Sequence, residues 1–171
     1  RNRRGRVKGI ETRGRLWKHS TLADLDGLVQ PDELDDLLIF ALVRNPWARA
    51  VSYYHWLRRQ AFDHPAVQIA KANDFGPFLN HRLIRESFRA SPARHYVTDA
   101  TGRERPALFL RLERFEEDAA PLFQHLGFRF ALPQENVTGT GAEYRRFYSD
   151  SDSNLLGEAC AEDVKRFGYA F

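Results

Sequence analysis

The sequence lacks methionine, and it contains only one cysteine, Cys160, and four lysines. A single cysteine excludes an intramolecular disulfide framework and a cysteine-rich zinc site. No apolar run approaches the roughly 20 residues that span a bilayer, so the sequence predicts no transmembrane helix. Of the 171 residues, 43% are hydrophobic and 29% are charged, which excludes a low-complexity or disordered chain. These values predict one domain of ordinary size over residues 1–171.

Basic charge is present but weak. The net charge is +3, and 22 of the 26 basic residues are arginines. A nucleic-acid-binding domain more often carries a concentrated basic face, so we expect no nucleic-acid partner. The start, RNRRGR, favours a flexible basic segment over residues 1–16. The arginine bias is typical of a GC-rich genome and favours a bacterial cytoplasmic protein. The alternative is the Golgi lumen, for a chain whose N-terminal anchor has been removed.

The hydrophobic pattern predicts an α/β fold. The unbroken apolar run 37–43 favours a parallel strand buried on both faces. Asn45 and Pro46 then suit the N-cap and first position of a helix over 47–60. A second apolar strand is predicted over 107–112. The remaining predictions are helices over 74–88, 113–126 and 151–167 and loops over 61–73 and 130–150. This alternation indicates a parallel sheet flanked by helices.

The turn between the first strand and its helix has the residues of a phosphate site. Arg44 stands at the carboxyl end of the strand, where open parallel sheets bind ligands. A helix N-terminus with free amide groups attracts phosphate, and a guanidinium grips it in bidentate fashion. Ser52 would add a hydroxyl and Arg49 a third contact. The competing interpretation is that Arg44 only ends the strand and Ser52 faces a neighbouring helix.

The string RNPWARAVSYYHW, residues 44–56, closely resembles a family motif. It is similar to the 3′-phosphate-binding motif of sulfotransferases that use 3′-phosphoadenosine 5′-phosphosulfate (PAPS). That pattern is an arginine after an apolar strand, Asn/Asp-Pro, a serine eight positions after the arginine, and an aromatic pair. The resemblance implies that Arg44 and Ser52 hold the 3′-phosphate of PAPS, or of its product 3′-phosphoadenosine 5′-phosphate (PAP). Arg49 would assist, and Tyr53 is counted with the nucleotide-binding residues. We expect the rings of Tyr53, Tyr54 and Trp56 in the core and the cleft wall, with one of them free to stack on adenine.

Flanking segments extend the resemblance to about residues 17–171. Trp17-Lys18-His19 looks like the Lys/His element that precedes this strand in several branches of the family. It implies that His19 is the general base toward the acceptor hydroxyl and that Lys18 neutralises the transferring sulfuryl group. The alternative for His19 is an ordinary surface histidine. In the C-terminal part, Arg145 and Arg146 belong to a loop, 137–146, expected to close over the nucleotide.

The segment after the second strand resembles the family element R-x-E-x-x-x-x-D. In this sequence the element comprises Arg111, Glu113 and Asp118. We interpret Glu113 and Asp118 as structural, one as a strand-end carboxylate and the other as a first-turn helix charge. Neither is expected to contact the nucleotide.

One family element has no counterpart in the sequence. The family's 5′-phosphosulfate loop, often read P-K-T-G-T-[ST]-S, is not found. The resemblance therefore implies a P-loop-kinase-like architecture without its N-terminal βα unit, and we expect that unit ahead of Arg1. The implied reaction moves a sulfuryl group to a hydroxyl or amine of a carbohydrate, lipid or small metabolite. The acceptor pocket would be built from the variable loops 61–73 and 89–105.

Two other functions share this fold class. A degenerate, non-catalytic nucleotide-binding domain would keep Arg44 and Ser52 but lose the reaction. A nucleotide kinase-like P-loop protein would need a Walker GxxxxGK[ST] motif and a magnesium-binding aspartate, neither of which the sequence shows. The six histidines have no metal-ligand spacing, so no metal is expected.

Overall fold

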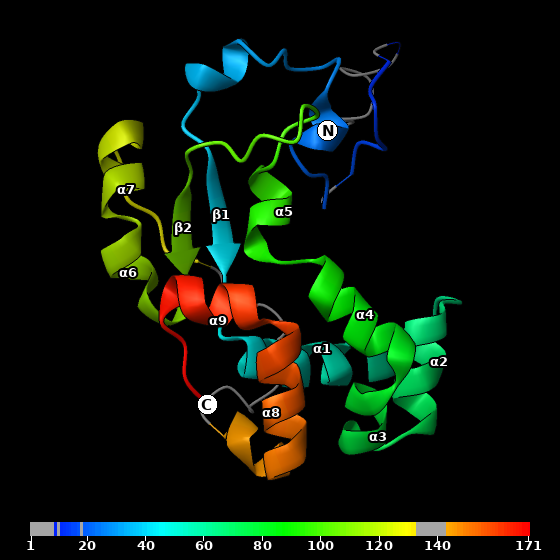
Figure 1. Ribbon diagram of the computed structural model, residues 1–171. Helices are drawn as coiled ribbons and strands as arrows, with labels where there is room; N and C mark the ends of the chain where they lie inside the picture. The colour runs from blue at the N-terminus through cyan, green and yellow to red at the C-terminus, as the bar shows by residue number, and fades with distance from the viewer. Residues whose placement is uncertain (1–8, 10, 18, 133–142) are drawn as a thin grey trace.

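The structure, a computed structural model, describes residues 9, 11–17, 19–132 and 143–171. Two parallel strands, β1 (Phe40–Val43) and β2 (Leu108–Arg111), lie side by side with helices around them (Figure 1). Phe40 is opposite Leu108, and Val43 is opposite Arg111. The predicted α/β class, with a parallel sheet flanked by helices, is therefore confirmed at this level.

The first strand is shorter and less covered than its sequence predicts. Only the last four residues of the apolar run form β1, and Phe40 and Leu42 remain 47% and 49% exposed. Among the described residues the sheet has two strands, so nothing pairs with the second edge of β1. Full burial on both faces needs neighbouring strands and a helix layer on each face, and β1 has only part of that cover.

The helix after β1 begins where the sequence predicts. α1 spans Pro46–Arg58, with Asn45 as its N-cap and Pro46 at its first position. Its buried face packs against α2 (Pro65–Ala72), α3 (Phe75–Asn80) and α8 (Asp150–Ala159), and α4 (Arg82–Ala90) completes the cluster. Most of the fully buried large side chains lie here, so this helical cluster is the main core.

Two of the predicted loops contain helices. Residues 61–73 include α2, because the His64 Nδ1 atom accepts a hydrogen bond from the Ala66 amide at 3.1 Å and Pro65 starts the helix. Residues 130–150 include the 3₁₀ helix η5 (Tyr144–Phe147). The loop prediction was therefore wrong for most of the first segment and for the described end of the second.

The predicted long helices are broken into shorter ones. The segment 74–88 forms α3 and α4, which are separated at His81, and the segment 151–167 forms α8 and α9 (Ala161–Phe167), which are separated at Cys160. Ser149, rather than Ser151, caps α8. The segment 113–126 becomes η4 (Leu112–Arg114), α6 (Phe115–Asp118) and α7 (Ala120–Leu126). The last of these ends at Gly127, with φ of 73°, as the sequence predicts.

On the side of the molecule that carries β1 and β2, a second apolar cluster packs β2 against α6 and α7, and buried polar contacts add to it. Arg105 is buried, and its guanidinium contacts the carboxylates of Asp99 at 2.5 Å and Asp35 at 2.6 Å. Hydrogen bonds from Thr101 and Arg105 hold the pKa of Asp99 well below its usual range. This network ties the short helix η3 (Glu33–Asp35) to the connection between α5 (Ala93–Val97) and β2.

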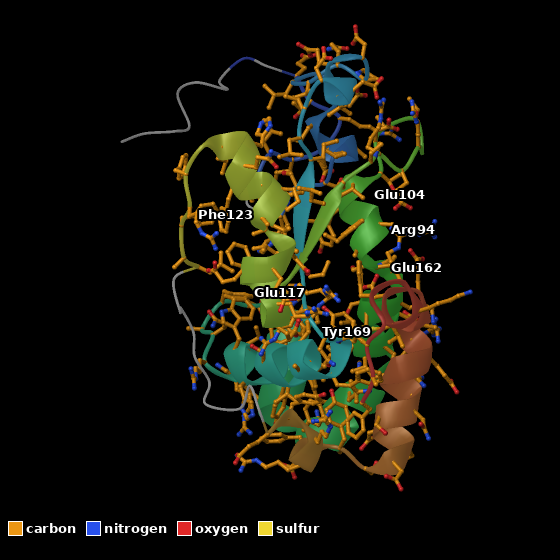
Figure 2. All side chains as sticks on the ribbon, turned by 90° about the vertical axis from the view of Figure 1, so that its left-hand side faces the viewer. Arg94, Glu104, Glu117, Phe123, Glu162 and Tyr169 are labelled. Atoms are coloured by element: carbon orange, nitrogen blue, oxygen red, sulfur yellow. The ribbon has the colours of Figure 1, made fainter. Side chains whose placement is uncertain are left out.

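A second set of charges joins α5 to α9. Arg94 pairs with Glu162 at 2.8 Å, and Arg166 contacts both Glu104 and Glu162. Figure 2 shows Arg94, Glu104 and Glu162 close together along one side of the molecule. These pairs are partly exposed, so each adds little stability by itself, but together they fix the wall that α5 and α9 form beside β1.

No helix among the described residues is long and apolar enough to span a membrane.

Candidate functional site

The start of α1 has its amide groups already engaged. Asn45 Oδ1 accepts hydrogen bonds from the amides of Trp47 at 3.0 Å and Ala48 at 3.2 Å, and Pro46 has no amide hydrogen. The Arg49 amide donates to the Asn45 carbonyl at 2.8 Å, as the first bond of the helix. The expectation of free helix amides is therefore corrected. A phosphate at this position would be held by side chains.

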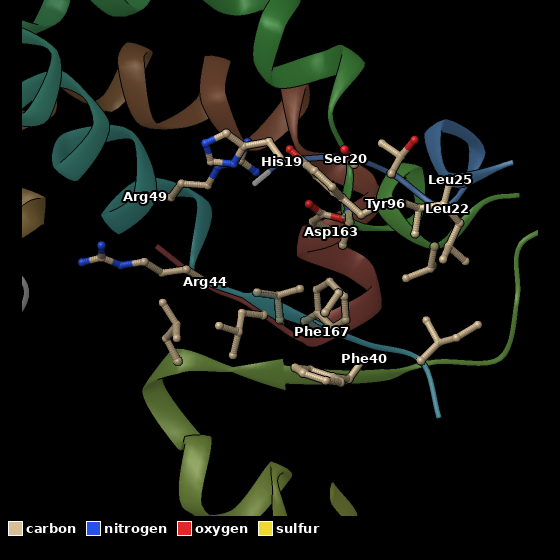
Figure 3. Close-up of a pocket in the computed structure, with 18 residues that line it drawn as sticks. His19, Ser20, Leu22, Leu25, Phe40, Arg44, Arg49, Tyr96, Asp163 and Phe167 are labelled. Carbon is tan, nitrogen blue, oxygen red and sulfur yellow. Dashed lines mark hydrogen bonds between the residues drawn. The ribbon is translucent and has the colours of Figure 1, made fainter. Parts of the chain in front are cut away.

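A cavity of about 550 Å³ runs along β1 (Figure 3). Its walls come from β1, the segment 19–25, α5 and α9. The lining residues that carry polar groups are His19, Ser20, Thr21, Arg44, Arg49, Tyr96 and Asp163. Three residues predicted from the sequence, His19, Arg44 and Arg49, are thus brought to one cavity at the carboxyl end of the strand.

The two arginines of this cavity extend in different directions. In Figure 3, Arg49 extends toward His19, whereas Arg44 extends away from it beyond the end of the strand. Arg49 also lies 5.2 Å from the centroid of the Phe88 ring. None of the ion pairs between described residues includes Arg44 or Arg49. Both guanidinium groups are thus available to an anionic ligand.

Ser52 does not line this cavity. A second cavity, of about 380 Å³, is lined by Arg44, Asn45, Ala48, Leu112, Glu113 and Tyr144. Ser52 follows Ala48 by four residues, and residues at this spacing share one face of a helix. Arg44 lines both cavities, so it stands between the face of α1 that carries Ser52 and the cavity that holds His19 and Arg49.

Three more predicted residues, Tyr53, Arg145 and Arg146, line neither of these cavities. Tyr53 packs in the helical core against Trp56, Phe78 and Phe88, and burial raises its pKa. Its ring is therefore packed among other aromatic rings, as expected for a core residue.

Arg145 and Arg146 stand on η5, which packs against α1. Arg145 lies over the rings of Tyr144 at 5.0 Å and Phe171 at 5.9 Å, and Arg146 pairs with Glu143 at 2.6 Å. Both arginines thus stand on an element that contacts α1, and each already has a partner within the C-terminal part of the chain. Lys18, and the part of the predicted closing loop before residue 143, lie outside the described residues.

Glu113 is closer to the site than the sequence indicates. Its carboxylate accepts the Asn45 amide at 2.8 Å and the Tyr169 hydroxyl at 3.3 Å, and it lines the second cavity with Arg44. The side-chain amide of Asn45 donates to the Ala170 carbonyl at 3.3 Å. Glu113 therefore links the end of β1 to the C-terminal segment, which supports its predicted structural role.

Asp118 is also structural, but for another reason than its place in a helix. It accepts hydrogen bonds from the backbone amide of Arg111 at 3.0 Å and from the guanidinium at 2.7 Å. The Arg111 guanidinium lowers the pKa of this carboxyl to about 2. Arg111 and Asp118 thus form a closed pair that fixes the end of β2.

Asp163 is the site residue that sequence reasoning missed. It is 8% exposed, it lines the larger cavity, and its Oδ1 accepts the Ala93 amide at 2.9 Å. Burial raises its pKa, and nearby Arg49 opposes that shift. In the sequence it is one acid in the polar run AEDVKR, with no spacing to set it apart.

Among the residues that the structure describes, no three His, Cys, Asp or Glu side chains are arranged to hold a metal ion. Comparison with protein-family models, curated proteins and solved structures finds no match to this chain.

Proposed function

We propose that this chain is a PAPS-dependent sulfotransferase domain of P-loop-kinase-like architecture. It would transfer a sulfuryl group to a hydroxyl or amine of an acceptor. One observation carries the proposal. Arg44, the first residue of the motif RNPWARAVSYY, shares a cavity with His19, the predicted base, at the carboxyl end of β1. The resemblance assigned these residues from separate segments, and the fold brings them together.

The side chains at this position suit a nucleotide 3′-phosphate. Arg44 and Arg49 supply positive charge without a carboxylate partner among the described residues, and Ser52 supplies a hydroxyl on the adjoining helix face. A phosphate dianion forms charge-assisted hydrogen bonds with such groups. Because Asn45 occupies the helix amides, affinity would depend mainly on the two guanidinium groups.

The proposal gives His19 and Arg49 separate roles in the reaction. PAPS, when bound, supplies the sulfuryl group, and PAP is the leaving group. His19 would accept the proton of the acceptor hydroxyl, since an imidazole has the basicity for this transfer near neutral pH. The Arg49 side chain, which extends toward His19, would stabilise the negative charge of the phosphate and sulfuryl oxygens.

Calorimetry with PAP tests the nucleotide half of the proposal. The wild-type protein should bind PAP, and Arg44→Ala should weaken binding by about tenfold or more, because charged hydrogen bonds contribute about 1.5–3 kcal/mol each. Arg82→Ala is the matched control, since its side chain is 83% exposed on α4 and should leave the affinity unchanged. A wild-type protein that does not bind PAP would contradict the proposal.

A non-catalytic nucleotide-binding domain, which would keep Arg44 and Ser52 without the transfer reaction, is the second candidate. His19→Ala distinguishes the two functions. For a sulfotransferase, this variant should lose sulfated product while it keeps its affinity for PAP. PAP binding without any sulfate transfer by the wild-type protein would support the second candidate instead.

A further inference from the structure

The second edge of β1 presents backbone groups that pair with no described residue. The Leu108 amide donates to the Ile39 carbonyl at 2.9 Å, and alternate residues of a parallel strand turn their backbone groups to opposite sides. Phe40 and Leu42 therefore direct their N–H and C=O groups to the open edge. The backbone hydrogen bonds between described residues include none to these four groups.

The residues of this edge do not hinder the addition of another strand. Native proteins usually protect a free edge with a charged side chain, a proline or a bulge. Residues 40–43, FALV, have no charge and no proline, and their register with β2 is continuous. The side chains of Phe40 and Leu42 are also about half exposed, so a strand added here would cover apolar surface and pair the free backbone.

The cavity along this edge has room for a short strand. It lies between β1 and walls that come from the segment 19–25, α5 and α9, so it forms a groove beside the edge (Figure 3). A strand rises about 3.3 Å per residue, takes about 4.8 Å of sheet width and about 10 Å of depth, so four residues fill roughly 600 Å³. The groove, at about 550 Å³, is close to that volume.

The lining of the groove suits a peptide because it is both polar and apolar. Tyr96 and Asp163 line it, and they offer a hydroxyl and a carboxylate. A strand paired with β1 has a second row of backbone amides on its far edge, and those amides would donate to such oxygens. Leu22, Val97 and Phe167 supply apolar surface for its side chains.

Charge at the carboxyl end of β1 selects the direction of the peptide. His19, Arg44 and Arg49 line the groove there, and none of the ion pairs between described residues includes either arginine. A strand parallel to β1 brings its carboxyl end to these residues, where a carboxylate would pair with a guanidinium. Asp163 is an acid in the same lining, but its Oδ1 atom already accepts the Ala93 amide.

We propose that the open edge of β1 binds an extended peptide of a partner protein as a parallel strand. The peptide has about four residues with apolar side chains and ends in an acidic residue or a free carboxylate. In this mode of recognition, main-chain hydrogen bonds give affinity and pockets for alternate side chains give specificity. The proposal goes beyond the sulfotransferase function and does not depend on it, because the backbone of β1 carries it.

Calorimetric titration with a synthetic peptide, acetyl-Lys-Val-Ile-Val-Asp with a free carboxyl end, tests the proposal. Only amides at alternate positions of the peptide face β1. N-methylation of one alternate set should therefore weaken binding by about tenfold or more, and methylation of the other set should weaken it less. A peptide that ends in an asparagine amide should also bind about tenfold more weakly, because it loses its pairing with Arg49.

Two variants of Leu42 test whether the peptide binds at the edge. Leu42→Pro removes the amide that faces the groove but keeps the ladder to β2, since edge strands tolerate proline. Leu42→Ala removes the side chain and keeps the amide, so Leu42→Pro should lose about tenfold more affinity than Leu42→Ala. Circular dichroism shows whether each variant folds, and the methylated peptides on wild-type protein test the edge without any substitution.

Arg49→Gln tests the charged end of the groove. It should weaken binding of the acidic peptide by about tenfold and leave the affinity for the asparagine amide unchanged. Arg82→Gln is the matched control, because the Arg82 side chain is 83% exposed on α4 and should affect neither peptide.

The outcomes separate this proposal from the sulfotransferase function. A wild-type protein that does not bind the peptide, or equal losses from both methylated sets, would overturn the strand site even if PAP binds. A dimer of the protein that Leu42→Pro dissociates would also overturn it, since the edge would then pair with a second copy. Peptide binding with the alternate pattern, in a protein that does not bind PAP, would confirm the strand site and contradict the sulfotransferase.

Discussion

The helical cluster and the strand side of this molecule are held together in different ways. Around α1, side chains such as Val51, Phe78 and Ile84 are completely buried, and packing is apolar. Beside β1, Phe40 and Leu42 stay half exposed. A smaller apolar cluster around Leu110 packs β2 against α6 and α7, and a buried ion pair joins Arg105 to Asp99. The difference indicates a rigid block of helices that carries Arg44 and Arg49 to the border of a more open, ligand-accessible region.

Replacement of a buried and of an exposed phenylalanine should give the largest difference in the free energy of unfolding between the two regions. Phe78→Ala should destabilise the protein by about 4 kcal/mol, because it opens a cavity in the helical core. Phe40→Ala should cost less than about 1 kcal/mol, because its ring is already half in water. Urea unfolding measures both free energies. Similar losses in the two variants would remove the distinction between the regions.

Loss of the buried ion pair between Arg105 and Asp99 should lower the free energy of unfolding almost as much as Phe78→Ala does. Arg105→Met leaves the buried carboxylate of Asp99 without its cation and should destabilise the protein by about 3 kcal/mol. Arg114→Met is the control, because the Arg114–Glu117 pair is more than half exposed and contributes little. Urea unfolding again gives the values, and a loss below that of the control would show that the strand side does not depend on this network.

Asn45 lies at the border between the two regions, and its loss should have an intermediate effect. Asn45→Ala removes the acceptor for the Trp47 and Ala48 amides and should lower stability by about 1 kcal/mol. Asn45→Asp, which keeps an acceptor, should retain most of that stability. An alanine variant as stable as the aspartate variant would contradict the capping role.

The smallest expected effect is a change of protein stability with pH, which comes from His55. Burial, with Arg58, Arg59 and Arg146 nearby, lowers the pKa of His55 below its ordinary value of 6.5, and its buried Nε2 has no partner among the described residues. The unfolded chain therefore binds a proton more readily, so the stability of the folded protein should fall as pH drops below 6.5. His55→Gln should flatten this part of a stability–pH profile measured by urea unfolding, and an unchanged slope would exclude His55 as its source.

Local sequence signals predicted the centre of the site well. The apolar run, Asn45 and Pro46 specify a strand, a cap and a helix start within a few residues, and the structure has all three. The sequence did not predict where two of the helices begin, because a histidine is the N-cap of each. His64 and His81 accept amide hydrogen bonds through Nδ1 at the starts of α2 and α4, a role usually predicted for Ser, Thr, Asp or Asn.

The rest of the site depends on contacts that no local pattern encodes. Glu113 reaches the Asn45 amide across 68 positions of sequence, and Asp163 reaches the Ala93 amide across 70. In the sequence, Glu113 has the pattern of an acid at the end of a strand, and Asp163 has that of an ordinary acid within a helix. Their place beside the cavities follows from how β2 and α9 pack, which single-residue preferences do not determine.

The contacts of Asn45 also set an order of events during synthesis. Its backbone amide donates a hydrogen bond to Glu113, which is synthesised 68 residues later. Its side-chain amide donates to the carbonyl of Ala170, which is synthesised 125 residues later. A nascent chain on the ribosome can build α1 early, but it cannot finish the turn at Arg44 until residue 170 has emerged. Contacts between such distant residues form slowly, so the turn at Arg44 should be among the last parts of the protein to mature.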